Sequence, residues 1–130
     1  MNTAIYTERR TFEKYDDQRY IVYLGEKVIP EYTLLAMDNT PQEPVTGYSY
    51  TGTEVDGGTL INATSPDRDS LINGIIRTRY SQTEEDAIKT HQIELLKGDK
   101  VEKSEEYEVE WNMFNEFRTN AIQTVDRWLS

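Results

Sequence analysis

The sequence contains no cysteine, a single histidine and only four prolines in 130 residues. Without cysteine, disulfides and thiolate metal sites are excluded, and cysteine usage says nothing about the cellular compartment. The residue patterns of Ser/His/Asp catalysis, of glycine-rich phosphate loops and of the Gly-x-Ser-x-Gly elbow are also missing. We therefore expect a protein that is not an enzyme and has no cofactor and no small-molecule substrate.

Basic residues and long apolar runs are scarce as well. Twenty-four acidic residues against fourteen basic ones give a net charge of −10, which repels phosphate backbones and anionic lipid surfaces. Residues 1–11 carry charges at Glu8, Arg9 and Arg10 and no apolar run, so we expect neither a signal peptide nor a membrane anchor. Direct contact with nucleic acid or membrane is not expected. The protein should be made and kept in the cytoplasm of its producer, unless it leaves as part of a larger particle.

Aromatic residues are plentiful by contrast. Hydrophobic residues make up 36% of the chain and the mean hydropathy is −0.76, but fourteen aromatics, nine of them tyrosine, supply large contact areas. A chain of this length buries one core and is too short for two of normal size. We expect it to fold, with a lean core that leaves room for part of the surface to be buried on a partner.

The first third of the chain has the pattern of β-strands. Residues 3–12 alternate loosely with a period of two, which predicts an edge strand or an arm. A turn at 15–18 leads into a β-branched and aromatic run that is typical of an inner strand. Pro30 should stop the next, short strand because it cannot donate to a ladder. The predicted strands cover residues 3–12, 19–24, 27–29 and 32–37.

Residues 38–47 have the composition of a linker, stiffened by two prolines. They suggest a strand-rich arm or subdomain at 1–45 and a second part at 46–130, although a single domain over 1–130 remains open. Beyond the linker, two strands at 48–53 and 59–63 should form a hairpin, because Asp56-Gly57-Gly58 supplies positive φ angles cheaply.

Three helices should follow. Ser65 is the predicted N-cap of the first, with Pro66 at its first position. Ser81 and Glu84 match the capping-box pattern at the start of the second, and Gly98 should end it. The predicted apolar faces are Leu71, Ile72, Ile75, Ile76 and Tyr80 in the first helix, and Ala87, Ile88, Ile93, Leu95 and Leu96 in the second.

The third helix, at 104–129, is the most strongly predicted element. No glycine or proline interrupts it, and its apolar residues step forward by three or four, as on one helical face. Ser104 is the predicted N-cap, ahead of two first-turn glutamates. The apolar stripe consists of Tyr107, Trp111, Phe114, Phe117, Ala121, Ile122, Val125, Trp128 and Leu129. The chain is therefore predicted to be an α+β protein with N-terminal antiparallel strands and a hairpin, followed by a three-helix part.

Two sets of residues could be considered for metal binding. The turn at 54–59 places two carboxylates near flexible carbonyls but lacks EF-hand spacing, so a plain turn is favoured. His91 and Glu94 share a helical face, yet a bundle-type metal site needs glutamates from other helices and usually a second Glu-x-x-His unit. We predict no metal site; a small enzyme or metal protein built on His91, Glu94 and the run of glutamates that follows them is the hypothesis we favour least.

Charges in the helical part allow both intramolecular and intermolecular roles. Residues 84–110 hold ten acidic residues and four lysines, which favours a solvated helix face over an acidic patch that docks on a basic partner. Arg77 and Arg79 form a local basic spot. With Arg68, they should pair with carboxylates of the same chain rather than with another subunit.

Tyrosines are concentrated between Tyr6 and Tyr50, on the predicted strands. Tyrosine suits sheets, but also interfaces, since it combines contact area with a hydrogen bond. The first half shows no helix-scale apolar face to cover that sheet. We therefore predict that residues 1–45 bind a neighbouring subunit. The candidate partner-binding residues are Tyr6, Arg9, Phe12, Tyr20, Tyr23 and Tyr32.

Three runs in residues 46–130 resemble a known group of proteins. They are YTGTEVDGGT at 50–59, INGIIRTRYS at 72–81 and EWNMFNEFR at 110–118. In this combination the chain is similar to small proteins encoded among the structural genes of tailed phages and prophages of gut Bacteroidales, the crAss-like phages included. The motifs carry no catalytic role, and residues 1–45 have no counterpart in the resemblance.

The resemblance implies a component of a virus particle or a helper in its assembly. Our first expectation is a non-enzymatic structural protein of the virion, in the head, connector or tail, made in the host bacterial cytoplasm. Its partners would be other phage structural proteins in a multi-subunit assembly. The alternative is an assembly chaperone for a tail fibre, which is not retained in the particle.

Overall fold

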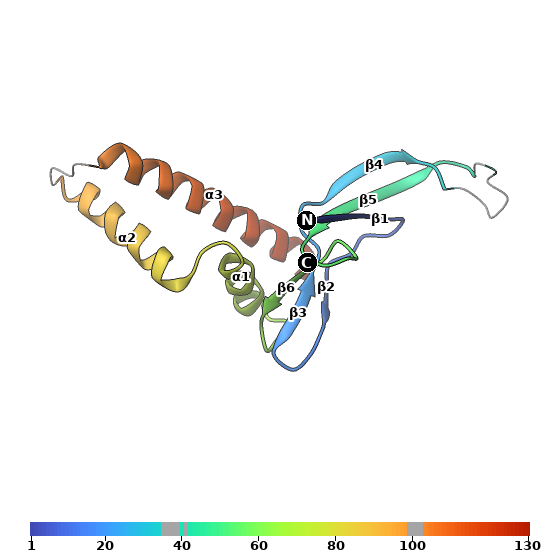
Figure 1. Ribbon diagram of the computed structural model, residues 1–130, viewed down its shortest axis with the longest axis horizontal. Helices are drawn as coiled ribbons and strands as arrows, with labels where there is room; N and C mark the ends of the chain where they lie inside the picture. The colour runs from blue at the N-terminus through green and yellow to red at the C-terminus, as the bar shows by residue number, and fades with distance from the viewer. Residues whose placement is uncertain (35–39, 41, 99–102) are drawn as a thin grey trace. The chain divides into compact units, whose positions relative to one another are not determined.

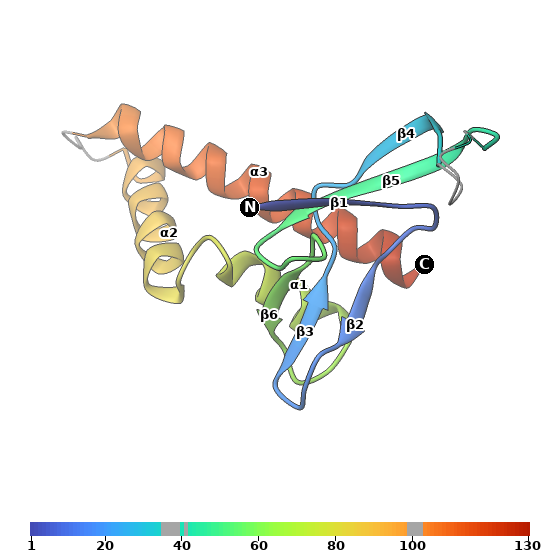
Figure 2. The ribbon, with the colours of Figure 1, turned by 45° about the vertical axis from the view of Figure 1, so that its right-hand side comes forward.

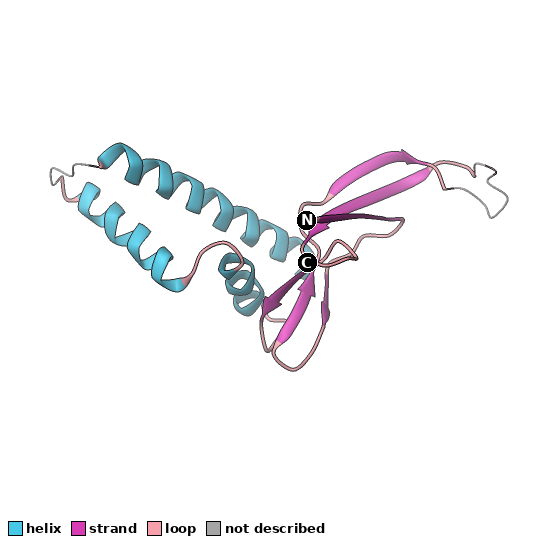
Figure 3. Ribbon diagram, viewed as in Figure 1, coloured by secondary structure: helices cyan, strands magenta, loops and turns pink. Residues whose placement is uncertain are grey.

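The computed structural model describes residues 1–34, 40, 42–98 and 103–130. In this part of the chain six strands precede three helices, so the α+β prediction is confirmed (Figure 1). The chain divides into two compact units, Met1–Thr64 and Ser65–Ser130. The first unit holds the strands and the second holds the helices (Figure 3).

The first unit contains two antiparallel three-stranded sheets (Figure 2). In one sheet the order is β1-β5-β4, and in the other it is β2-β3-β6. Each sheet therefore combines a strand from the start of the unit's sequence with a strand from its end. The strands are β1 (Asn2–Tyr6), β2 (Phe12–Lys14), β3 (Arg19–Val22), β4 (Lys27–Tyr32), β5 (Val45–Gly52) and β6 (Thr59–Asn62).

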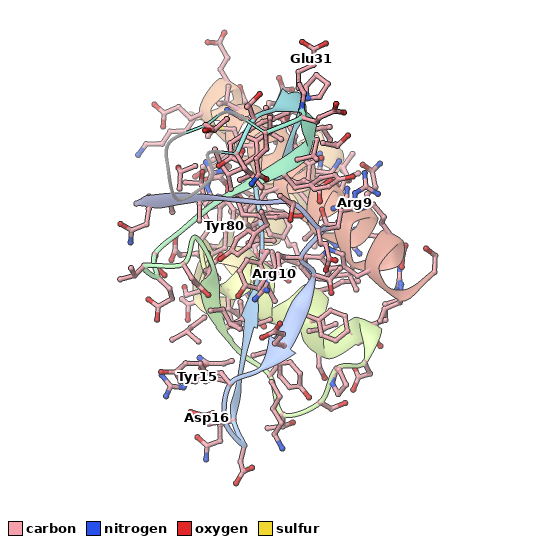
Figure 4. The ribbon with its side chains drawn as sticks, turned by 90° about the vertical axis from the view of Figure 1, so that its right-hand side faces the viewer. Arg9, Arg10, Tyr15, Asp16, Glu31 and Tyr80 are labelled. Atoms are coloured by element: carbon pink, nitrogen blue, oxygen red, sulfur yellow. The ribbon has the colours of Figure 1, made fainter. Side chains whose placement is uncertain are left out.

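The predicted turn at 15–18 is confirmed and closes a hairpin between β2 and β3. Tyr15 and Asp16 lie at its tip (Figure 4). The Tyr15 N–H donates to the Arg19 carbonyl at 3.0 Å, and Asp16 Oδ1 accepts from the Gln18 N–H at 2.9 Å. The Arg19 guanidinium and this Gln18 N–H lower the pKa of Asp16.

The predicted hairpin between the strands at 48–53 and 59–63 is wrong. Both strands and the turn between them exist, and the Glu54 N–H donates to the Gly58 carbonyl at 2.9 Å. However, β5 is the central strand of its sheet, with β1 and β4 on its two sides, and β6 pairs with β3 instead. The glycine-rich turn therefore carries the chain from one sheet to the other.

Two other strand boundaries differ from the prediction. The run at 3–12 is split into β1 and the start of β2. Pro30 does not stop its strand, because β4 is an edge strand whose register shifts between Ile29 and Tyr32, where proline is tolerated. Residues 35–37 of the predicted strand at 32–37, and residues 38, 39 and 41 of the predicted linker, lie outside the described residues.

The division between units is also later than the predicted boundary at 45/46. It falls between Thr64 and Ser65, because β5 pairs with β1 and β4 while β6 pairs with β3. Strands at 45–62 are thus structurally inseparable from the first 45 residues. The core of this unit is built around Ile21, Tyr23 and Tyr50, with Tyr6, Tyr48 and Leu60 packed against them.

In the second unit, helix α1 spans Arg68–Arg77 and buries its predicted apolar residues up to Ile76. Its N-cap is Asp67, which accepts from the Ser70 N–H at 2.8 Å; the prediction of Ser65 was wrong. Ser65 instead donates its hydroxyl to Asp67 at 2.6 Å. Tyr80 lies beyond the helix, and its ring meets that of Phe114 edge-on at 5.1 Å.

Helix α2 spans Gln82–Leu96 and begins with the predicted capping box, in which Ser81 and Glu84 each bond the other's backbone N–H. It ends before Gly98, whose φ of 75° is the left-handed conformation of a helix terminator. The predicted apolar face is largely wrong. Of its five residues only Ile88 is buried, whereas Ala87, Ile93 and Leu96 are exposed.

Helix α3 spans Ser104–Leu129, as predicted, and contacts both α1 and α2. Phe114, Ala121 and Val125 of its stripe are buried, but Leu129 is exposed. Ser104 is the first helical residue rather than the N-cap, and the N-cap Lys103 makes no side-chain capping bond. Within the described ranges no helix combines the length and apolar character needed to cross a membrane.

Candidate functional site

The six predicted partner-binding residues all lie in the first unit, but they differ in how much surface they offer. Tyr20 and Tyr23 are 7% and 1% exposed, so they belong to the interior and present almost nothing to a partner. Arg9 is exposed, and the remaining three, Tyr6, Phe12 and Tyr32, are half-buried. Partner binding through these six residues stays a prediction. Because Tyr20 and Tyr23 are buried, they are poor candidates for contact with a partner.

Arg9 and Arg10 are consecutive, but their side chains point in different directions (Figure 4). The Arg9 guanidinium lies 5.4 Å from the Tyr48 ring centroid and its Nε is 3.4 Å from Glu26. The Arg10 guanidinium lies 4.8 Å from the ring centroids of both Tyr6 and Tyr23. Cations stack on tyrosine faces because the ring quadrupole is negative there.

Tyr6, Tyr23 and Tyr50 form an aromatic triangle beneath Arg10. The ring centroids are 5.7 Å apart for Tyr23 and Tyr50, 6.0 Å for Tyr6 and Tyr23, and 6.1 Å for Tyr6 and Tyr50. Since Tyr6 belongs to β1, Tyr50 to β5 and Tyr23 directly follows β3, side chains from both sheets meet here. We call these residues, with Glu26 and Asp56, the Arg10 cluster.

Hydrogen bonds run through the Arg10 cluster. Arg10 Nη2 donates to the Tyr23 hydroxyl at 3.0 Å, and that hydroxyl donates to Asp56 Oδ2 at 2.8 Å. The Arg10 N–H donates to the Tyr50 hydroxyl at 2.9 Å, which donates to Glu26 at 2.8 Å. Nothing in the sequence points to a role for Arg10 or Glu26, since neither stands in a recognisable motif.

The Arg10 cluster is suited to holding structure rather than to moving protons. Burial raises the pKa of Tyr50 to about 12, and burial is also the largest influence that raises the pKa of Tyr23. Both hydroxyls therefore stay protonated at neutral pH, whereas a catalytic tyrosine base needs a lowered pKa. The pKa of Arg10 is raised, chiefly by its hydrogen bond to Tyr23.

The Asp56 carboxylate accepts two hydrogen bonds within the cluster, and the turn at 54–59 leads from β5 to β6. Oδ1 accepts from the Gly58 N–H at 3.0 Å and Oδ2 accepts from Tyr23. The backbone carbonyl of Asp56 also accepts from the Tyr6 hydroxyl at 2.6 Å. These bonds fix the turn against β1 and β3.

Strand β1 forms an edge of its sheet, and the backbone groups that point away from β5 can be identified. The Thr51 N–H donates to the Leu24 carbonyl at 3.1 Å, on the β4 side of β5. Backbone groups alternate in direction along a strand, so the N–H and C=O groups of Tyr50, next to Thr51, point toward β1. Ala4 is paired with Tyr50, and its N–H and C=O groups point toward β5. The N–H and C=O groups of Thr3 and Ile5 therefore point outward, away from the sheet.

The four edge strands of the first unit are protected to different degrees. Natural sheets guard their edges with charges, prolines, bulges or short strands. Strand β4 has Lys27, Pro30 and a register shift, β2 is three residues long and carries two charges, and β6 has two of four residues buried. Strand β1, Asn-Thr-Ala-Ile-Tyr, has none of these guards, and Ile5 is 40% exposed.

In the second unit, the residues considered for metal binding are used otherwise. His91 stacks on Tyr107 with 3.8 Å between ring centroids, and its Nδ1 is 2.5 Å from Glu110 on α3. Glu94 is not part of this contact. Within the described residues, no three histidine, cysteine or acidic side chains are grouped as a metal site requires.

The acidic residues of α2 and α3 have mixed roles. Glu85 is buried and forms ion pairs with Arg77, at 2.8 Å, and with Lys89, whereas Glu105, Glu106 and Glu108 are exposed. Whether the exposed residues dock on a basic partner stays a prediction. Comparison of the chain with family models, curated proteins and solved structures finds no match.

Proposed function

We propose that this chain is a non-enzymatic structural protein of a tailed-phage particle, in the head, connector or tail, which binds a neighbouring subunit through its N-terminal strands. The phage assignment is supported by the resemblance of the runs at 50–59, 72–81 and 110–118. The mode of binding is supported by one structural observation, the unguarded outer edge of β1.

An unguarded edge favours recognition by strand addition. The outward N–H and C=O groups of Thr3 and Ile5 offer a partner strand the same hydrogen bonds that β5 makes on the other side. The Arg10 cluster supports this surface from inside, because Tyr6 anchors the end of β1 to Asp56. A rigid edge loses little conformational entropy when a partner strand is added.

Proline substitution tests this edge. Ile5→Pro removes an outward N–H and leaves the ladder to β5 intact. Val28→Pro is the matched control, because Val28 pairs with Tyr48 and, by the same alternation, points its N–H away from β5 on the opposite edge. With each variant as the only source of the protein, Ile5→Pro should be lost from purified particles and Val28→Pro retained. Circular dichroism and thermal melting establish that both are folded.

Mass spectrometry of purified particles tests the assignment itself. The protein should be found in washed particles at a constant ratio to the major structural proteins. Its absence from particles would remove the proposal. Equal incorporation of Ile5→Pro and wild type would remove the β1 edge as the binding surface while leaving the virion assignment in place.

A second candidate is the tail-fibre assembly chaperone. It is favoured by the exposed carboxylates of α3, Glu105, Glu106 and Glu108, which would hold a basic partner surface and then release it. Co-purification with fibre protein from infected-cell lysate, together with absence from the finished particles, is the result that distinguishes this role from the first.

A further inference from the structure

We propose that α3 is a self-association surface, on which the α3 helix of a second copy packs antiparallel with the two-fold axis near Met113. This inference goes beyond the proposed function and does not depend on which particle, if any, contains the protein. It rests on an exposed apolar stripe, on an arginine that forms no ion pair with a described residue, and on the charge distribution along the helix.

The first observation is an apolar stripe on the surface of α3. Val109 and Met113, one helical turn apart, are 57% and 47% exposed, and Phe117 on the next turn is half-buried. Beside Met113 and Phe117 lies an open hollow of about 190 Å³, which Arg79, Glu116 and Asn120 also line. Covering these apolar side chains removes them from water, which favours association.

The second observation is the state of Arg79. Its guanidinium lies 5.4 Å from the Phe117 ring centroid and 5.5 Å from that of Tyr80, at the rim of the hollow. Arg68 and Arg77 meet the sequence prediction by pairing with Asp126 and Glu85 of the same chain. Arg79 has no ion pair with any residue that the structure describes. Arg79 thus places a positive charge on the rim of the hollow, and Glu116, which also lines the hollow, forms no ion pair with it.

The third observation is the charge distribution along α3. Residues 104–116 carry five glutamates and no basic residue, a net charge of −5. Residues 117–129 carry Arg118 and Arg127 against Asp126, a net charge of +1. A parallel pair of α3 helices would place the two acidic halves together. An antiparallel pair places each acidic half against the basic half of the other copy, where opposite charges attract.

These observations select a second copy as the occupant. An interface between two identical chains related by a two-fold axis must be complementary to itself, and α3 carries both the acidic half and the basic half on one helix. With Met113 on the axis, Val109 of one copy lies opposite Phe117 of the other and fills the hollow. Arg79, held against Phe117, then faces the Glu105–Glu108 turn of the second copy.

Cysteine cross-linking tests the arrangement without background, because the chain has no cysteine of its own. Met113→Cys should form a disulfide-linked dimer under mild oxidation. Val109→Cys should not: in the antiparallel pair its two copies are about 12 Å apart along the axis, and a disulfide requires Cα atoms within about 7 Å. A mixture of Glu106→Cys and Asn120→Cys chains should cross-link to each other more than either does alone.

Sedimentation equilibrium of the full chain tests the charge contribution. Arg79→Glu should weaken the dimer about tenfold, the order of one well-placed charge pair at an interface. Lys14→Glu makes the same change in net charge in the first unit, where Lys14 pairs with the exposed Asp17, and should leave the dimer unchanged. A wild-type chain that stays monomeric at all concentrations, or cross-linking of Val109→Cys but not of Met113→Cys, would overturn the proposal.

Discussion

The hydroxyl of Tyr23 donates a 2.8 Å hydrogen bond to Oδ2 of Asp56, joining the end of β3 to the turn that follows β5. Tyr23 follows a strand of one sheet and Asp56 follows a strand of the other, and among the described residues the two sheets share no strand. Side-chain hydrogen bonds of the Arg10 cluster therefore help to connect the two sheets, as backbone hydrogen bonds connect the strands within one sheet.

Replacing Tyr23 with phenylalanine should destabilise the first unit by about 1–3 kcal/mol, because Asp56 and Arg10 lose a hydrogen-bond partner in a part-buried site. Urea unfolding measures the change. Tyr15→Phe is the control, since Tyr15 is exposed at the tip of the β2–β3 hairpin. Equal stability of the two variants would show that the cluster contributes nothing.

Tyr50 should ionise later than an ordinary tyrosine. Burial raises its pKa to about 12, against about 10 in an unfolded chain. The associated stability is fully present below about pH 10 and is lost as the pH rises through about 12, because the unfolded chain gives up this proton first. Ultraviolet titration of tyrosinate should show a late step in the native protein, absent from Tyr50→Phe and from the urea-unfolded chain.

Glu85 should make the second unit sensitive to acid. Burial is the largest single influence on the pKa of Glu85 and raises it. The hydrogen bonds from Lys89 and Arg77 together outweigh burial, so the pKa of Glu85 is lowered overall. A lowered pKa means that the stabilisation is present above the ordinary glutamate pKa, about 4.3, and is lost as the pH falls through the folded-state value.

Glu85→Gln should therefore be less stable than wild type at neutral pH, and the gap should close as the solution is acidified. Urea midpoints at a series of pH values measure this, with the exposed Glu105→Gln as control. A gap that stays constant with pH would mean that the ion pairs with Arg77 and Lys89 do not lower the pKa of Glu85.

Two serines that look alike in the sequence should behave differently. Ser81 closes the capping box of α2, so Ser81→Ala should cost about 1 kcal/mol. Ser104 caps nothing, because α3 begins on it without a side-chain capping bond, and Ser104→Ala should be close to neutral. Thermal melting of the two variants measures this difference. A large loss of stability in Ser104→Ala would show that Ser104 is the N-cap of α3, as predicted from the sequence.

Helix positions were the most predictable part of the fold. Local signals decide them: the capping box at Ser81, the terminating Gly98 and the uninterrupted stripe of 104–129 need no distant partner. The first cap was missed by two residues because Ser65, Pro66 and Asp67 all suit a helix start. The exposed apolar residues of α2, such as Leu96, show that periodicity alone does not reveal which face finds a neighbour.

Strand pairing was the least predictable part. The turn at Asp56-Gly57-Gly58 has the composition of a hairpin, but composition does not reveal that both sides of β5 are taken by β1 and β4. The same pairing makes β1 an edge strand. Whether a strand lies at an edge depends on its neighbours in the sheet, which local sequence does not reveal. Tyr23 was predicted to face a partner and is instead interior, because alternation does not tell which face of a strand will be covered.

By itself, the sequence determined the α+β class, the extent of α3 and the capping of α2, because these depend on interactions within a few residues along the chain. The tertiary structure alone decided the two-sheet topology, the division at Thr64/Ser65 and the assembly of Arg10, Tyr23, Tyr50 and Asp56 into one cluster. Those features join residues tens of positions apart, and such contacts are selected by the packing and hydrogen bonding of the whole unit.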